Sequence, residues 1–170
     1  MIERAREAAR RVQARLADEI NEVIEDGRGV VIRTSAAAVP AVLRALKEDD
    51  QTPFDMLTNE IAVDYSKWTE ETGLPAPPGR FGLMYNLYSI SATTRIFVEV
   101  FIEDGQQVPS AEPYYASANW SEREIFDMFG IKFTGHPDLR RIYMQDDFEG
   151  YPLRKEFPRR GFEPQDFPQE

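Results

Sequence analysis

Residues 81–102 read FGLMYNLYSISATTRIFVEVFI and contain two runs in which apolar and polar side chains alternate. The apolar positions are Phe81, Leu83, Tyr85 and Leu87 in the first run, and Ile96, Val98, Val100 and Ile102 in the second. When apolar and polar residues alternate with a period of two, one face of the strand is apolar and packs against a core. The polar stretch between the runs is typical of a turn, so the segment predicts an antiparallel hairpin.

Shorter patterns on the N-terminal side predict further strands and a helix. Residues 30–32 predict a buried strand, and residues 54–63 lead into a second strand that ends near Tyr65. A helix is predicted from about Pro40 to Glu48, because proline is well suited to the first helical position. Residues 66–80 are rich in Pro and Gly and predict a loop. Helices, strands and a further helix in this order favour an α+β fold with a mixed, largely antiparallel sheet.

The first 26 residues predict one amphipathic helix, from about Ile2 to Asp26. Its apolar positions recur every three or four residues: Ala9, Val12, Leu16, Ile20 and Val23. Arginines crowd the first half and acids the second, an order that opposes the helix macrodipole. Two interpretations stay open: a solvated helix that tolerates a small cost, or a docking helix whose ends meet oppositely charged partner surfaces.

A last helix is predicted just before residue 130. Asn119 is a candidate N-cap with Glu122 as its capping-box partner, and Gly130 supplies the stop. Trp120 is predicted to lie in the core, in one aromatic cluster with Phe126, Phe129 and Phe133.

Composition excludes several classes of function. The 170 residues carry a net charge of −10, which makes nucleic acid an improbable partner and a basic protein surface a suitable one. There is no Cys and one His, so thiolate-held clusters, disulfides and Cys/His zinc sites are not expected. No run approaches the roughly 20 apolar residues that span a bilayer. The N-terminus lacks an apolar signal core, which favours a cytosol-side protein.

An acid–base enzyme is one functional alternative. It would have to use His136 with Glu122, Glu124 or Asp138. Glu122 and Glu124 are two positions apart on a predicted helix and face different ways, and a second His is missing. The competing interpretation is a turn at His136-Pro137 whose imidazole satisfies a backbone group.

Residues 122–158 read EREIFDMFGIKFTGHPDLRRIYMQDDFEGYPLRKEFP. This stretch resembles the signature of the C subunit of NADH–quinone oxidoreductase, respiratory complex I. Upstream, LTNEIAVDY, RFGLMYNLYSI, TRIFVEVFIED and VPSAEPYYASANW resemble the same family, so the resemblance runs from about Val30 to Pro158. The motif GHPDLRRI favours the bacterial type.

The resemblance implies a structural subunit of the peripheral arm of a proton-translocating enzyme that transfers electrons from NADH to quinone. It implies that this chain binds no cofactor. It also implies that NADH, FMN, iron–sulfur clusters and quinone are bound by partner subunits. The partners would be the cluster-bearing and quinone-cavity subunits of a hetero-oligomer, held at the cytoplasmic face of the cell (inner) membrane without a span of its own. An equivalent scaffold in a membrane-bound hydrogenase or a coenzyme F420-dependent dehydrogenase is the alternative.

Two parts of the chain are distinguished: a globular α+β domain over residues 1–147 and an extended Pro- and aromatic-rich arm over residues 148–170. Proline blocks helix and central-strand pairing in the arm, so we expect it to be mobile alone and ordered against a partner. No catalytic, cofactor-binding or metal residue is predicted. Neutral surface rich in aromatic residues and Arg is typical of interface cores. The residues predicted to lie at subunit interfaces are Glu122, Arg123, Glu124, Asp127, His136, Arg140, Arg141, Tyr151, Arg154, Lys155 and Phe157.

Overall fold

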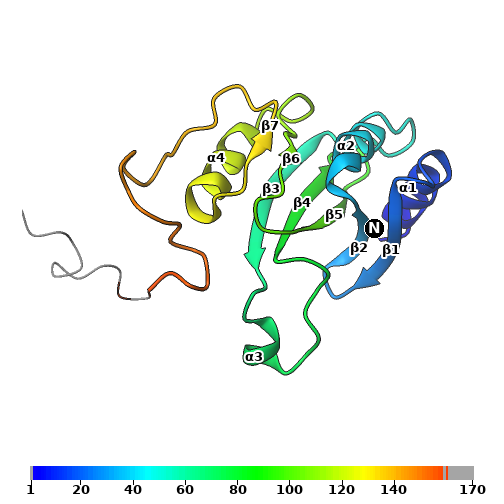
Figure 1. Ribbon diagram of the computed structural model, residues 1–170. Helices are drawn as coiled ribbons and strands as arrows, with labels where there is room; N and C mark the ends of the chain where they lie inside the picture. The colour runs from blue at the N-terminus through cyan, green and yellow to red at the C-terminus, as the bar shows by residue number, and fades with distance from the viewer. Residues whose placement is uncertain (1, 159, 161–170) are drawn as a thin grey trace, which may run out of the picture.

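The computed structural model describes residues 2–158 and 160. Its centre is a five-stranded sheet of order β1-β2-β5-β4-β3 (Figure 1). The strands are β1 (Ile20–Asp26), β2 (Gly29–Thr34), β3 (Met56–Asp64), β4 (Phe81–Ser89) and β5 (Thr94–Ile102). Within this sheet, β2 and β5 pair in parallel, and the other neighbours pair antiparallel. The predicted α+β class with a mixed, largely antiparallel sheet is therefore confirmed.

The predicted hairpin is confirmed in register, with Leu83 opposite Val100 and Leu87 opposite Ile96. Its odd-numbered positions on β4 and even-numbered positions on β5 are buried in the main core. The hairpin supplies the middle of the sheet, which explains why its sequence pattern is the clearest in the chain.

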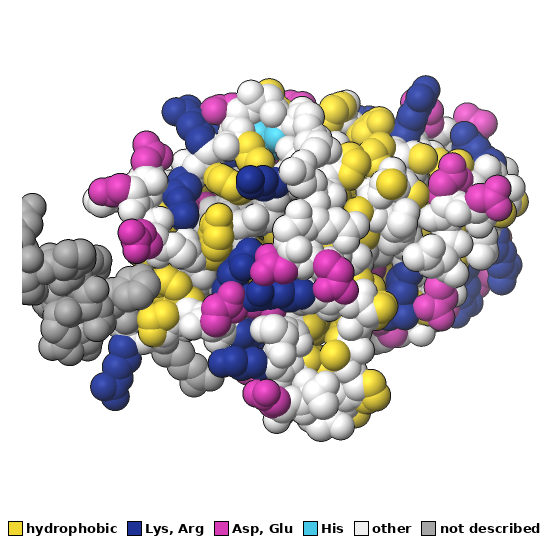
Figure 2. Space-filling model, viewed as in Figure 1, with side chains coloured by type: hydrophobic (Ala, Val, Ile, Leu, Met, Phe, Trp, Pro, Cys, Tyr) yellow, Lys and Arg dark blue, Asp and Glu magenta, His cyan; other side chains and the backbone are white. Residues whose placement is uncertain are grey.

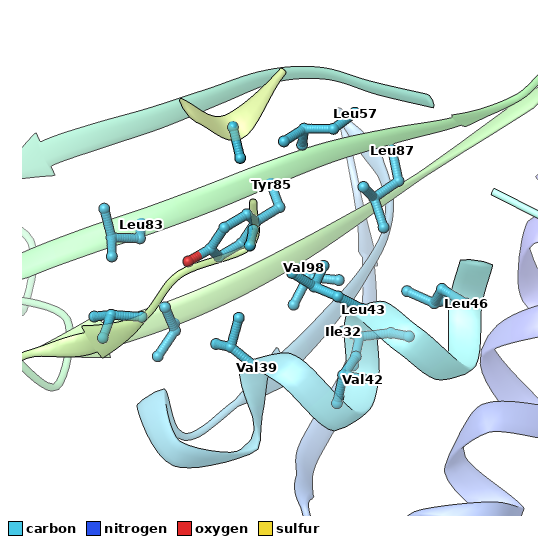
Figure 3. Close-up of a cluster of buried hydrophobic side chains, with 14 of the residues drawn as sticks. Ile32, Val39, Val42, Leu43, Leu46, Leu57, Leu83, Tyr85, Leu87 and Val98 are labelled. Carbon is cyan, nitrogen blue, oxygen red and sulfur yellow. The ribbon is translucent and has the colours of Figure 1, made fainter. Parts of the chain in front are cut away.

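Three helices add side chains to the same core: α1 (Ile2–Arg15), α2 (Val39–Lys47) and α4 (Ala118–Phe129). Figure 3 shows Leu43 and Leu46 of α2 facing Ile32 of β2 and Val98 of β5. Pro40 lies in the first turn of α2, as predicted. At the other edge of the sheet, α4 packs beside β3 (Figure 1).

The remaining elements are short. A 3-10 turn η1 (Ala36–Ala38) precedes α2, and α3 (Trp68–Thr72) lies inside the predicted loop of residues 66–80. Strands β6 (Val108–Pro109) and β7 (Phe133–Thr134) pair in parallel on either side of α4 in sequence. Within the part of the chain that the structure describes, no helix is both long and apolar enough to cross a membrane.

The single helix predicted from Ile2 to Asp26 is wrong in its second half. The chain leaves α1 at Arg15 and then forms β1, which pairs with β2. Pairing with the edge of a buried sheet satisfies the backbone hydrogen-bonding groups of this acidic half. This pairing outweighs the helical spacing of its apolar residues. The charge order is thereby explained, because a helix that ends at Arg15 has a base in its last turn, as the macrodipole favours. On β1, Glu22 forms an ion pair with Arg33 of β2.

The predicted capping box at the start of α4 is also wrong. The helix begins after Ser117, and no side chain caps it. The Glu122 carboxylate instead turns inward, where it accepts hydrogen bonds from Ser110 and the backbone N–H of Ala111. The predicted stop at Gly130 is confirmed, with a left-handed φ of 76°.

Candidate docking surface on helix α4 and the signature segment

We call residues 120–158 the signature segment. Its helical part, α4, buries three charged side chains, those of Glu122, Arg123 and Asp127, while Glu124 stays exposed. The prediction that Glu122 and Glu124 face different ways is confirmed. Buried charges must be paired or hydrogen-bonded, so each of these three identifies an internal contact.

Asp127 fastens the chain after α4 to the helix. Its Oδ2 accepts hydrogen bonds from the backbone N–H groups of Ile142, Tyr143 and Met144 at 3.0, 2.7 and 3.0 Å. Its Oδ1 accepts one from Arg141 at 2.8 Å. Burial acts to raise the pKa of Asp127, but these hydrogen bonds outweigh it and hold the pKa below its ordinary value.

Arg141 extends this contact into the predicted arm. One guanidinium nitrogen donates to Asp127, and the other donates to the carbonyl oxygens of Phe148 and Gly150 at 3.2 and 3.1 Å. The guanidinium also lies 5.3 Å from the centre of the Tyr151 ring. Arg141, predicted as an interface residue, therefore pairs within the chain.

Arg154 and Tyr151 hold the arm against the C-terminal end of α4. Arg154 donates to the carbonyl oxygen of Phe129 at 2.6 Å and pairs with Asp104 at 3.0 Å. The Tyr151 ring lies on Gly130, where an added Cβ would come within 2.5 Å of the ring. Gly130 is thus required twice, by its left-handed backbone and by this close approach.

Ion pairs continue to the end of the described arm. The backbone N–H of Lys155 donates to buried Asp64 at 3.0 Å, and its ammonium pairs with Glu71. Arg80 bridges Asp64 and Glu156. Figure 2 shows basic and acidic side chains interleaved on the face above α3.

The described part of the arm therefore contacts its own domain, and the expectation that it orders only against a partner stays a prediction. Phe157 stacks on Phe148, with 6.0 Å between the ring centres. The domain boundary at residue 147 stays a prediction, and the part of the arm after Arg160 lies outside the described residues.

A pair of buried carboxyl groups lies behind this surface. Glu122 of α4 and Glu60 of β3 are both buried, beside the buried hydroxyl of Tyr85. Burial raises the pKa of Glu122 to about 7, although hydrogen bonds from Ser110 and Ala111 act against this shift. Burial, and after it the charge of Glu122, raise the pKa of Glu60 well above its ordinary value. At neutral pH the pair therefore carries fewer than two charges.

His136 has a structural place next to this pair. Its buried ring has Nε2 3.0 Å from the carbonyl oxygen of Asn119 and 4.0 Å from a Glu122 oxygen. Nδ1 accepts the backbone N–H of Asp138, which leaves the proton on Nε2, where it is donated to Asn119. Both nitrogens are used, so the imidazole satisfies backbone groups in a turn, as one of the two interpretations of the sequence holds.

Trp120 lies on the surface, and the prediction that it is a core residue is wrong. Its side chain is 64% exposed, with the guanidinium of Arg123 4.8 Å from the ring centre. Arg123 in turn donates to the carbonyl oxygen of Arg140, whose own side chain is 70% exposed and pairs with Asp138. The core aromatic pair is Phe81 with Phe129.

We expect Trp120 to emit as indole in water does. The measurement is the fluorescence spectrum of a Trp68→Phe variant, in which Trp120 is the sole tryptophan. Because Trp120 is exposed, an added soluble quencher should reach it freely in the folded protein. A blue-shifted, protected emission that turns red only on unfolding would contradict the exposure of this ring.

The structure groups the predicted site residues into two sets. The first set makes contacts within the chain and consists of Glu122, Asp127, His136, Arg141, Tyr151, Arg154, Lys155 and Phe157. In the second set, Glu124 and Arg140 face outward, and Arg123 supports Trp120. Whether these residues meet another subunit stays a prediction. Sequence reasoning missed Glu60 and Tyr143. The available signal for Glu60 was an acid among the apolar residues of a predicted strand.

A separate surface hollow lies elsewhere, with a volume of about 720 Å³. It is lined by the ends of β1 and β2, by Phe101 and by the Pro-rich loop that includes Leu74. No residue of the signature segment lines it, so we do not connect it with that segment.

The sequence and the fold of this chain both match subunits of respiratory complexes. The chain belongs to the family described as the 30 kDa subunit of respiratory-chain NADH dehydrogenase, whose profile matches residues 32–163. The C subunit of NADH–quinone oxidoreductase from Sinorhizobium medicae is 39% identical over an alignment of 157 positions, and the match covers 85% of this chain and 74% of that protein.

Two solved structures share the fold. A trypsin-resistant fragment (1–134) of Nqo5 is 26% identical with a TM-score of 0.60, covering 78% of this chain and 99% of the fragment. A chain of an archaeal membrane-bound sulfane sulfur reductase, described as a respiratory membrane complex, is 25% identical with a TM-score of 0.71. That match covers 91% of this chain and 86% of the other.

Proposed function

We propose that the chain is a structural, non-catalytic subunit of the peripheral arm of a proton-translocating NADH–quinone oxidoreductase. Electrons pass from NADH to quinone through FMN and iron–sulfur clusters in neighbouring subunits, and this chain binds none of these groups. The observation that carries the proposal is the family match over residues 32–163, which includes most of the sheet and the whole signature segment.

The chemistry of the residues supports the cofactor-free role. The 170 residues contain no Cys to supply thiolate ligands to a cluster. Among residues 2–158 and 160, no group of three or more His, Asp or Glu side chains is placed to hold a metal ion. The one His has both ring nitrogens engaged inside the chain, which argues against the acid–base enzyme.

The internal fastening of the signature segment supports the structural role. Asp127, Arg141 and Arg154 tie the chain that follows α4 to the rest of the domain. This leaves a preformed surface with exposed Trp120 and Tyr143, and a preformed surface loses less entropy on binding. The partners are the cluster-bearing and quinone-cavity subunits of a hetero-oligomer, and the chain is held peripherally at the cytoplasmic face of the membrane through them.

The alternative machines have less support. The protein from Sinorhizobium medicae and the matching family profile are both named for NADH-oxidising enzymes, whereas neither is named for a hydrogenase or an F420-dependent dehydrogenase. The likeness to a chain of a sulfane sulfur reductase shows that the fold also occurs in a respiratory complex with another activity.

Removal of the chain from cells tests the proposal. Membranes from cells that lack it should lose NADH–quinone reductase activity and the assembled peripheral arm, and the full chain should restore both. Because the chain is proposed to act by position, cells that lack it should still make the separate partner subunits. Full activity and assembly without the chain would refute the proposed function.

The purified chain should be colourless and free of stoichiometric metal. The reason is that the chain has no Cys to supply thiolate ligands, and its one imidazole, that of His136, is already hydrogen-bonded within the chain. Metal analysis by mass spectrometry, together with an absorption spectrum, makes the measurement. Iron, zinc or flavin bound at one equivalent per chain after gel filtration would contradict it.

A further inference from the structure

A groove runs between the edge strand β3 and the first turns of α4. Its volume is about 290 Å³, and residues of β3, α4 and the chain held by Asp127 line it. Strand β3 is the last of its sheet, and its register shifts between Leu57 and Asn59, within the groove. The groove is therefore built from the sheet edge and the signature segment together.

A buried carboxyl group borders this groove. Glu60 lines it and is only 7% exposed. One of its oxygens accepts a hydrogen bond from Ser121 at 3.3 Å, the other is fully buried, and the buried hydroxyl of Tyr85 lies beside the carboxyl group. Because Glu60 is buried, the exposed carboxylate of Glu124 is the acceptor that a ligand in the groove can reach.

The rim of the groove is aromatic and acidic. Trp120 and Tyr143 line it and are 64% and 62% exposed, and Glu124 lies beside them. No Lys or Arg of the described chain lines the groove. Arg123 already stacks on Trp120, which shows that this ring accepts a guanidinium, and the ring is still mostly exposed with Arg123 in place.

We propose that this groove receives a basic side chain, Arg or Lys, presented by a partner subunit. The cation lies against Trp120 and Tyr143 and donates hydrogen bonds to the carboxylate of Glu124. This inference rests on the proposed function, because it supplies the docking residue of an assembled complex.

Four features favour a basic protein side chain as the occupant. Aromatic faces attract Arg and Lys cations, and more strongly where water is excluded. Carboxylates accept charge-assisted hydrogen bonds from the same groups. The chain has a net charge of −10, which favours partners with a basic surface. The groove is shallow enough to leave both rings exposed, which suits a side chain that arrives from another surface.

A small-molecule probe tests the cation directly. In the Trp68→Phe variant, the indole signal of Trp120 is followed by NMR while N-acetyl-arginine amide is added. We expect a saturable shift with a dissociation constant of about 1 mM, the order expected for a single side chain. The uncharged N-acetyl-citrulline amide should shift it at least tenfold less. Equal responses to the two probes, or none to either, would overturn the cation site.

Assembly tests the docking role. The chain with Trp120→Ala and Tyr143→Ala should keep its melting temperature, since both rings are exposed, but about tenfold less of it should be recovered in the complex. Ile90→Ala is the matched control, because Ile90 is 63% exposed and does not line the groove. Glu124→Gln should weaken capture with the fold intact.

Normal recovery of the double variant would overturn the inference. That failure differs from a failure of the proposed function. If cells that lack the chain lose the complex while the double variant assembles normally, only the docking groove is wrong. If cells that lack the chain keep the complex, the proposed function itself is wrong.

Discussion

Replacing Asp127 with alanine should lower the free energy of unfolding by about 3–5 kcal/mol, the range for removing one member of a buried ion pair. The substitution leaves the guanidinium of Arg141 without its carboxylate and frees three backbone N–H groups from their acceptor. For a chain of this size the melting temperature should fall by roughly 10 °C. Denaturant unfolding of the purified chain measures the change.

Asp138→Ala is the control for this experiment. Its carboxylate pairs with Arg140 on the surface, so its removal should change stability by no more than about 0.5 kcal/mol. A loss below about 1 kcal/mol for Asp127→Ala would show that the segment after α4 is held by other contacts.

The dependence on pH gives an independent check of Asp127. Its pKa is lowered in the folded chain, so its contribution is complete above the unfolded pKa of about 4 and is lost as the pH falls through the folded value. The variant should therefore lose less stability than the parent chain in that acid range, where Asp49 and Asp64, whose pKa values are also lowered, titrate in both chains. An unchanged acid limb in the variant would contradict the assignment.

Replacing Glu122 with glutamine should produce the second large effect, with the opposite dependence on pH. Since the folded pKa is raised to about 7, the folded chain keeps a proton that the unfolded chain has lost. The free energy of unfolding of the parent chain should therefore fall by about 2–4 kcal/mol as the pH rises from about 4 to 7, and it should then level off. Glutamine keeps the shape and the hydrogen bonds of the protonated acid, so the variant should lack this decline.

The comparison is made by thermal or denaturant unfolding at pH 5 and pH 8. At pH 8 the Glu122→Gln chain should be more stable than its parent, and at pH 5 the two should be similar. Glu124→Gln is the control, because Glu124 lies on the exposed side of the same helix. Parallel curves for Glu122→Gln and its parent across this range would show that the buried carboxyl is charged throughout.

Local patterns predicted the parts of this fold that depend on local physics. The alternation over residues 81–102 predicted the central hairpin, because its core side chains lie on two neighbouring strands that a single turn connects. Pro40 and Gly130 predicted a helix start and a helix stop, since both residues act through their own backbone angles.

Long-range contacts set what the sequence could not predict. Ile20 and Val23 fit a helical spacing, and only pairing with β2 decides that they belong to a strand. Trp120 is apolar and follows the start of α4, yet its side of the helix faces solvent. The juxtaposition of Glu60 with Glu122 depends on how α4 packs beside β3, and no local pattern contains that information.

The resemblance predicted the family. The structure adds the contacts that the signature segment makes within this chain. Asp127, Arg141 and Arg154 were predicted as interface residues, and all three make internal contacts that hold the segment in place. Trp120 and Tyr143 stay exposed at the surface, and of the predicted interface residues Glu124 and Arg140 also face outward.

A native purification from membranes through a tag on this chain, with identification of every subunit and assignment of each cofactor, tests the proposed structural role most directly. We expect one complex in which flavin and all iron–sulfur clusters belong to other subunits and in which NADH reduces quinone. Recovery of the chain alone from intact membranes, or of a flavin or cluster bound to it, would show that the chain does not have this role.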